Sequence, residues 1–171
     1  DPRAEASQQF FATLQNKMRW AAHGHTAAEV IVARADAGKP NLGLTHHAGA
    51  TPRRAEAGIA KNYLSADELD TLNRIVTAYL EFAELQARQR KPMTMQAWIG
   101  KLDDFLRLGD RDVLTHAGRV SAEEARAKAQ AEYDAWRRRQ DALPSPAERD
   151  MTQALEQAVK AMPKPKGKTK S

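Results

Sequence analysis

The side chains most capable of chemistry gather near the start of the chain. They are polar or titratable and fall within residues 15–34: Gln15, Asn16, Lys17, His23, His25, Glu29 and Arg34. An imidazole can transfer a proton near neutral pH, and a lysine or arginine can stabilise an anion. On this interpretation His23 or His25 transfers the proton, and Lys17 or Arg34 stabilises negative charge. The cluster would then serve a nucleic-acid- or nucleotide-directed enzyme.

The same cluster also fits a structural role at a junction between two helices. Glu29 stands three residues after Thr26, which is the spacing of a capping box. His23 lies in the last turn of a helical pattern, where a cation suits the helix dipole. Lys17 and Arg34 can be solvated cations. The structural interpretation is favoured, and an anion pocket at the start of the second helix remains the alternative.

Metal and cofactor chemistry find little support in the residue pattern. The five histidines lack the pair spaced by four residues with an intervening glutamate that marks a helical zinc site. The absence of cysteine excludes thiolate nucleophiles and cysteine-based zinc sites. Asp103 and Asp104 are neighbours on a helix and point about 100° apart, so we expect a solvated acidic face. We predict no metal site and no cofactor.

We expect helices to position these residues, because the same helix-start signal recurs along the chain. A hydroxyl residue is followed three positions later by glutamate at Thr26, Ser65, Ser121 and Ser145. Glycines that suit helix ends follow several patterns, at Gly24, Gly38, Gly109 and Gly118. Together these signals predict helices over residues 4–23, 26–37, 52–63, 65–90, 94–108, 110–117, 121–142 and 145–162.

The longer predicted helices carry apolar stripes at helical spacing, which predict core-facing sides. The last of them shows Met151, Leu155, Ala158 and Met162. The fold class is therefore all-α, an irregular bundle of about seven to eight helices. We expect a helical domain over residues 1–143, an appended helix over 144–162 and a disordered basic tail over 163–171. Residues 39–51 form the one long irregular stretch, so we expect a functional or mobile loop there.

The charge of the chain is concentrated at its end. Four lysines lie in the last eight residues, and removing them changes 27 Lys+Arg to 23 against 22 Asp+Glu, a net charge of +1. The tail is predicted to be solvated, with an auxiliary contact to phosphates as the alternative. No apolar run is long enough to span a membrane, and no secretion signal is present, so we expect a cytoplasmic protein without membrane contact. Because the chain begins with Asp1, we expect a longer protein upstream.

Several sequence blocks resemble the RhuM virulence protein family. The run from Phe10 to Met18 contains the Gln-Asn-Lys block, and His23 to Glu29 contains the Thr-Ala-Ala-Glu block. The likeness continues through Ala60 to Leu64 and Leu72 to Val76, and it covers roughly residues 3–136. His46 and His47 depart from the threonine and aromatic residue typical after Gly-Leu-Thr.

The resemblance implies a limited set of properties. Members of the family are encoded in bacterial pathogenicity islands, and they typically carry an N-terminal region that looks like a DNA-binding domain. This chain would be the C-terminal portion. Family-matching polar positions are Gln15, Asn16, Lys17, Lys61, Asn62 and Asn73. Asn73 shares a predicted face with Leu69, Leu72 and Val76, so we expect it to be buried and hydrogen-bonded, either structurally or in a shared polar pocket.

Two functions from different classes follow. The leading hypothesis is a helical interaction and oligomerisation module of a DNA-associated accessory protein from a pathogenicity island or mobile element. Its partners would be a second copy of the chain and nucleic acid, the latter through the absent upstream region and the basic tail. The alternative is the nucleic-acid- or nucleotide-directed enzyme, with its site at residues 15–34 together with Lys61 and Asn62.

Overall fold

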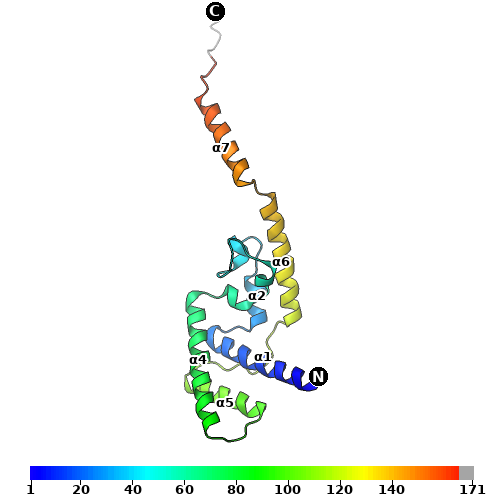
Figure 1. Ribbon diagram of the computed structural model, residues 1–171, viewed down its shortest axis with the longest axis vertical. Coiled ribbons are helices and arrows are strands. Elements are labelled where there is room, and N and C mark those ends of the chain that lie inside the picture. The colour runs from blue at the N-terminus through cyan, green and yellow to red at the C-terminus, as the bar shows by residue number, and fades with distance from the viewer. Residues whose placement is uncertain (166–171) are drawn as a thin grey trace, which may run out of the picture. The chain divides into compact units, whose positions relative to one another are not determined.

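The computed structural model describes residues 1–165, and its regular structure is entirely helical within that range (Figure 1). The predicted all-α class is confirmed. The α-helices and two short 3-10 helices follow in the order α1 (Pro2–His23), α2 (Ala27–Arg34), η1 (Pro40–Gly43), α3 (Arg54–Ala57), η2 (Ala60–Tyr63), α4 (Ala66–Arg88), α5 (Met95–Leu108), α6 (Ala122–Ala142) and α7 (Pro146–Ala161). No helix among residues 1–165 combines the length and apolar character needed to cross a bilayer.

The predicted helix starts are confirmed at the atomic level. Complete capping boxes form at Thr26, Ser65 and Ser145, each with the glutamate three residues later. At Ser121 the hydroxyl accepts from the Glu124 backbone amide at 3.0 Å. Gly24 ends α1 in the left-handed conformation with φ 78°. Local capping chemistry therefore determines where most helices begin.

The chain divides into two compact units, residues 1–136 and residues 137–171. The first unit holds one hydrophobic core, to which α1, α2, α4, α5 and the first part of α6 contribute. Its most deeply buried side chains include Val30, Leu42, Tyr63, Leu102 and Leu106. Within this unit α1 packs on both α4 and α5. Tyr79 and Phe82 of α4 meet Phe105 of α5 with ring centroids 5.8 and 5.9 Å apart.

Two helix predictions within the first unit are wrong. Residues 52–63 do not form one helix, because the single turn α3 ends at Gly58 and the 3-10 turn η2 follows. The helix predicted over residues 110–117 is also absent, because residue 110 lies in a turn and residues 111–117 are irregular. In that segment Leu114 is buried and its backbone oxygen accepts a hydrogen bond from Lys17. A tertiary contact thus replaces the local bonds that a helix would have made.

The irregular stretch at residues 39–51 is held by specific hydrogen bonds. The backbone oxygen of Asn62 accepts from the amides of Thr45 and His46, at 2.7 and 3.1 Å. The Glu56 carboxylate accepts from the amides of Ala48 and Arg53, at 2.7 and 2.8 Å. The loop is consequently part of the fold of the first unit.

The second unit contains the last turn of α6 and the helix α7. Every residue of α7 is exposed. The prediction that Met151, Leu155, Ala158 and Met162 form a core face is therefore wrong, because α7 buries none of its residues. The basic tail predicted for residues 163–171 lies mostly outside the described residues.

Candidate functional site

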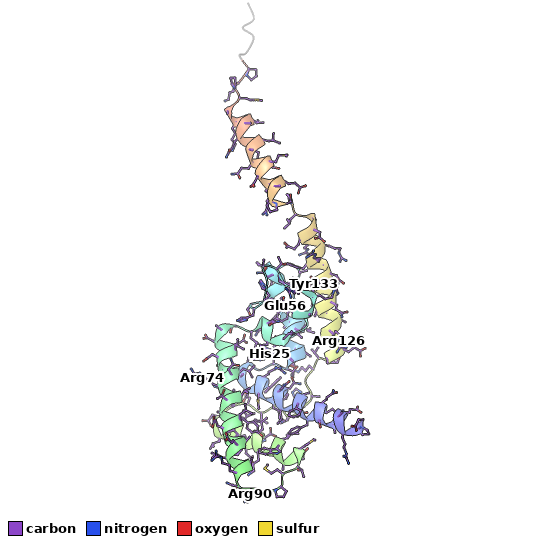
Figure 2. All side chains as sticks on the ribbon, in the orientation of Figure 1. His25, Glu56, Arg74, Arg90, Arg126 and Tyr133 are labelled. Atoms are coloured by element: carbon purple, nitrogen blue, oxygen red, sulfur yellow. The ribbon has the colours of Figure 1, made fainter. Side chains whose placement is uncertain are left out.

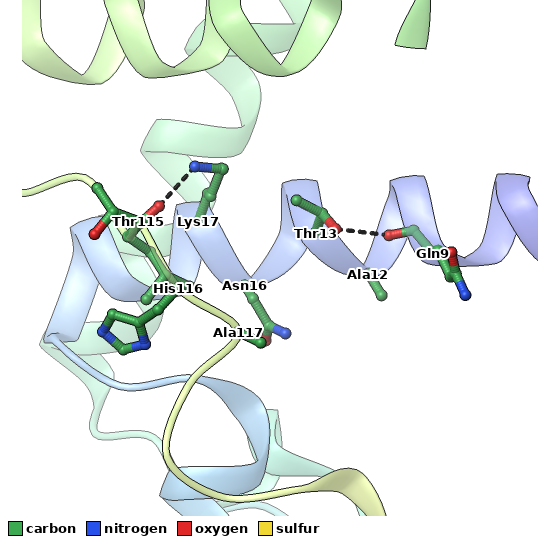
Figure 3. A pocket seen from close by; sticks show the side chains of 9 residues that line it. Gln9, Ala12, Thr13, Asn16, Lys17, Thr115, His116 and Ala117 are labelled. Carbon is green, nitrogen blue, oxygen red and sulfur yellow. Dashed lines mark hydrogen bonds between the residues drawn. The ribbon is translucent and has the colours of Figure 1, made fainter. Parts of the chain in front are cut away.

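Lys17 occupies the wall of a cleft in the first unit with a volume of about 550 Å³. Figure 3 shows its side chain directed at the segment that carries Thr115 and His116. The Lys17 Nζ atom donates to the Leu114 oxygen at 2.6 Å and lies 2.9 Å from a carboxylate oxygen of Asp103. Lys17 is only 8% exposed. This ammonium group is therefore neutralised by Asp103, and that carboxylate does not belong to a solvated face as the sequence had suggested.

The next residues of the predicted cluster stabilise the start of α2. The Asn16 side-chain oxygen accepts from the Ala27 amide at 3.2 Å. The Glu29 carboxylate accepts from the amides of Thr26 at 2.9 Å and Arg119 at 3.2 Å. Burial pushes the pKa of Glu29 up, but these backbone donors outweigh it and the pKa lies below its ordinary value. Gln15 is exposed on α1.

Arg34 forms a two-pronged ion pair rather than an open cationic site. Its two terminal nitrogens donate to the two carboxylate oxygens of Glu68 at 2.6 and 2.7 Å, and one also donates to the Tyr63 oxygen at 3.0 Å. The hydrogen bonds from Arg34 are the main cause that lowers the pKa of Glu68 to about 2. This pair connects α2 to the start of α4.

His23 and His25 stand at the junction between α1 and α2, with ring centroids 6.1 Å apart. His25 is exposed, between the end of α1 and the start of α2. His23 is half-buried, and neither ring nitrogen has a hydrogen-bond partner among the described residues. Burial is the main cause that lowers the pKa of His23 from 6.5 to about 4, while the charge of Glu68 acts in the opposite direction. His23 is thus neutral at pH 7.

The remaining predicted positions do not join this cluster in a single pocket wall. Lys61 is exposed on η2, and the side-chain nitrogen Nδ2 of Asn62 donates to the Glu56 backbone oxygen at 3.1 Å. Asn73 is exposed, so the expectation of burial is wrong. The buried line of α4 runs through Leu72, Ile75 and Tyr79, which places Asn73 beyond its edge.

A family model covers most of the chain. The family model of the virulence protein RhuM family matches residues 1–143. This chain belongs to the RhuM family. Neither the curated proteins nor the solved structures contain a significant match to it. The predicted resemblance is confirmed, and the matched range contains the entire first unit and α6, whereas α7 lies beyond it.

Sequence reasoning missed several residues of the RhuM domain whose hydrogen-bond or ion-pair partners lie far away in sequence. Asp103 is the counter-ion of Lys17, and Glu68 binds Arg34 in addition to capping α4. Glu132 of α6 accepts from the Ala37 amide at 2.7 Å. Only the capping role of Glu68 carried a sequence signal, in the spacing from Ser65. Arg19 and Arg126, which line a second groove, carried none.

Proposed function

We propose that this RhuM-family chain is a helical interaction module that self-associates through α7. It would belong to a DNA-associated accessory protein of a bacterial pathogenicity island or mobile element. The observation that carries the proposal is an uncovered apolar stripe on α7. Met151, Leu155, Val159 and Met162 lie along one side of the helix, and their exposed fractions are 66, 61, 65 and 68%.

A helix of this kind needs a surface on which to pack. The helix α7 has 16 residues, a length at which an isolated helix is only marginally stable in water. Its start is strongly capped, but a capping box contributes only about 1 kcal/mol. Burial of the apolar stripe would supply the missing stabilisation.

A second copy of α7 is the occupant we favour, because the stripe alternates large and small side chains. Ala154 and Ala158 lie between Met151, Leu155 and Val159. In an antiparallel pair about a two-fold axis, Leu155 of one copy would meet Ala158 of the second copy, and the reverse contact would be identical. The central Glu156 would meet Gln157 of the second copy, so like charges would not face one another there.

The contacts of the predicted catalytic cluster support an interaction module more than an enzyme. Lys17 and Arg34 have carboxylate partners, and Asn16 and Glu29 bind backbone amides at the start of α2. These contacts give the cluster a structural task. Nucleic-acid contact would come from a region upstream of this chain and from the lysines that begin at Lys164.

Sedimentation velocity over a range of concentrations tests the self-association. We expect the chain to form a dimer and Leu155→Glu to be monomeric at the same concentrations. Gln153→Glu is the matched control, because it introduces the same charge on the opposite side of α7 and should preserve the dimer. A chain that remains monomeric, or a Leu155→Glu variant that still dimerises, would contradict the proposal. If α7 instead docked on its own chain, the protein would remain monomeric.

A further inference from the structure

A second groove in the first unit is lined by cationic and hydrogen-bond-donating side chains. It lies between α1, the start of α2 and the start of α6, and its volume is about 510 Å³. Arg19 lines it from α1, and Arg126 lines it from the N-terminal half of α6, where Figure 2 labels it. Alanines make up much of the remaining wall, which leaves the space open.

The two arginines lack the carboxylate partners that other cations of this unit possess. Within residues 1–165, neither Arg19 nor Arg126 forms an ion pair or donates a side-chain hydrogen bond, whereas Lys17, Arg34 and Arg54 all have carboxylate partners. None of the residues that line the groove is acidic. The groove therefore carries two positive charges that no ion pair neutralises within residues 1–165.

Additional donors face the same groove. Thr26 and Ser121 both line it, and each hydroxyl oxygen already accepts from a backbone amide of its helix, at 3.3 and 3.0 Å. Their hydroxyl hydrogens remain to be donated. The Asn16 side-chain oxygen is bound to the Ala27 amide, which leaves its NH₂ group as a donor at the groove. The amides of Ala27 and Glu29 at the start of α2 are already bonded, so side chains supply most of the donors.

We propose that this groove is a binding site for a phosphate group, with Arg19 and Arg126 as its principal ligands. Arginine presents several donors in a planar fork that matches phosphate oxygens. A tetrahedral phosphate has acceptors in several directions, and donors enter the groove from three helices. A planar carboxylate would use fewer of them.

The state of Arg19 agrees with this assignment. Burial lowers its pKa, and no carboxylate opposes that effect. A partly buried guanidinium without a counter-ion is costly, and a bound anion would remove that cost. Glu123 and Glu124 in the first turn of α6 are exposed and do not line the groove.

Inorganic phosphate is the first probe, titrated into the full chain with binding followed by NMR. Arg19→Met and Arg126→Met should each weaken phosphate binding by about tenfold, because each removes charge-assisted hydrogen bonds. Arg138→Met is the matched control, since it removes the same charge from an exposed position of α6 outside the groove and should change affinity by less than about twofold. Arg126 is exposed, so its variant should keep the native circular dichroism even if the Arg19 variant does not fold.

A fluorescent single-stranded oligonucleotide distinguishes the source of the phosphate. If the groove variants weaken oligonucleotide binding relative to Arg138→Met, the ligand is a phosphodiester backbone. If they weaken only the binding of inorganic phosphate, the ligand is a free phosphate or small phosphate ester. The lysine-rich tail is present in every variant, so its contribution cancels. Absence of phosphate binding by the unaltered chain, or equal binding by all three variants, would overturn the assignment.

Discussion

At the residue scale, His23 is a half-buried imidazole whose pKa is lowered by its surroundings. Both ring nitrogens are buried without partners among the described residues, and burial lowers the pKa from 6.5 to about 4. The groups that act on it electrostatically include Glu68, His25, Arg34 and Arg19. Three of these can carry positive charge, so a protonated His23 would be poorly compensated.

The protonation of His23 predicts an acid sensitivity of folding. Between pH 6.5 and about 4 the unfolded chain binds a proton at this position and the native chain does not, so the free energy of unfolding falls as the pH falls. His23→Gln removes this titration, and the variant should lose less stability than the unaltered chain between pH 6.5 and 4.5. Urea unfolding at several pH values measures the free energy of unfolding of both proteins. Carboxylates with lowered pKa values, such as Glu68, act below about pH 4.5, so parallel profiles above that pH would contradict the prediction.

The ion pair between Arg34 and Glu68 should contribute more than exposed pairs elsewhere in the unit. Glu68→Gln keeps an acceptor for the Ser65 amide and removes the charge, and we expect a loss of about 2 kcal/mol at pH 7. Asp70→Asn is the matched control, because its pair with Arg74 is exposed on the same helix and its loss should destabilise the chain much less. Chemical denaturation compares the stability of the two variants. Equal losses of stability would show that the Arg34 pair contributes no more than an exposed pair.

At the element scale, sequence reasoning succeeded where structure is determined locally. The capping boxes at Thr26, Ser65 and Ser145 depend on residues three apart, so they were predictable. The irregular segment at residues 111–117 was not predictable, because the backbone oxygen of Leu114 accepts a hydrogen bond from Lys17, which lies 97 residues away in sequence. The same distinction between local and long-range contacts applies to the candidate site. The sequence identified its polar residues, but their partners Asp103 and Glu68 could not be assigned without the packing of α1 on α5 and the ion pair that joins α2 to α4.

The connection after α2 contains a glycine that the backbone requires. Gly43 has φ 82°, and a Cβ atom there would collide with the backbone oxygen of Arg34. Gly24 has a similar φ of 78° but has open space around it. Gly43→Ala should therefore cost more than about 3 kcal/mol, and Gly24→Ala only about 1 kcal/mol. Thermal unfolding of the two variants tests this, and a similar loss for both would mean that the loop can shift to accept the added atom.

At the scale of the whole molecule, the division into two units places the boundary inside α6. Trp136 is 3% exposed in the core of the first unit, and Glu132 binds the Ala37 amide. Arg54 pairs with Asp134 and lies 5.1 Å from the centre of the Tyr133 ring. The first part of α6 therefore belongs to the core, whereas residues 137–142 belong to the second unit.

Two truncations separate these roles. A chain ending at Ala142 lacks α7 but retains every α6 residue that contacts the core, so its urea unfolding midpoint should match that of the full chain when both are monomeric. A chain ending at Ala131 also loses Tyr133 and Trp136, and removing a buried tryptophan alone costs about 3–5 kcal/mol. It should unfold at much lower urea or fail to fold. If both truncations lost stability equally, α7 would be part of the same cooperative unit as the core. The predicted outcome instead leaves α7 free to associate while the groove at Arg19 and Arg126 stays folded.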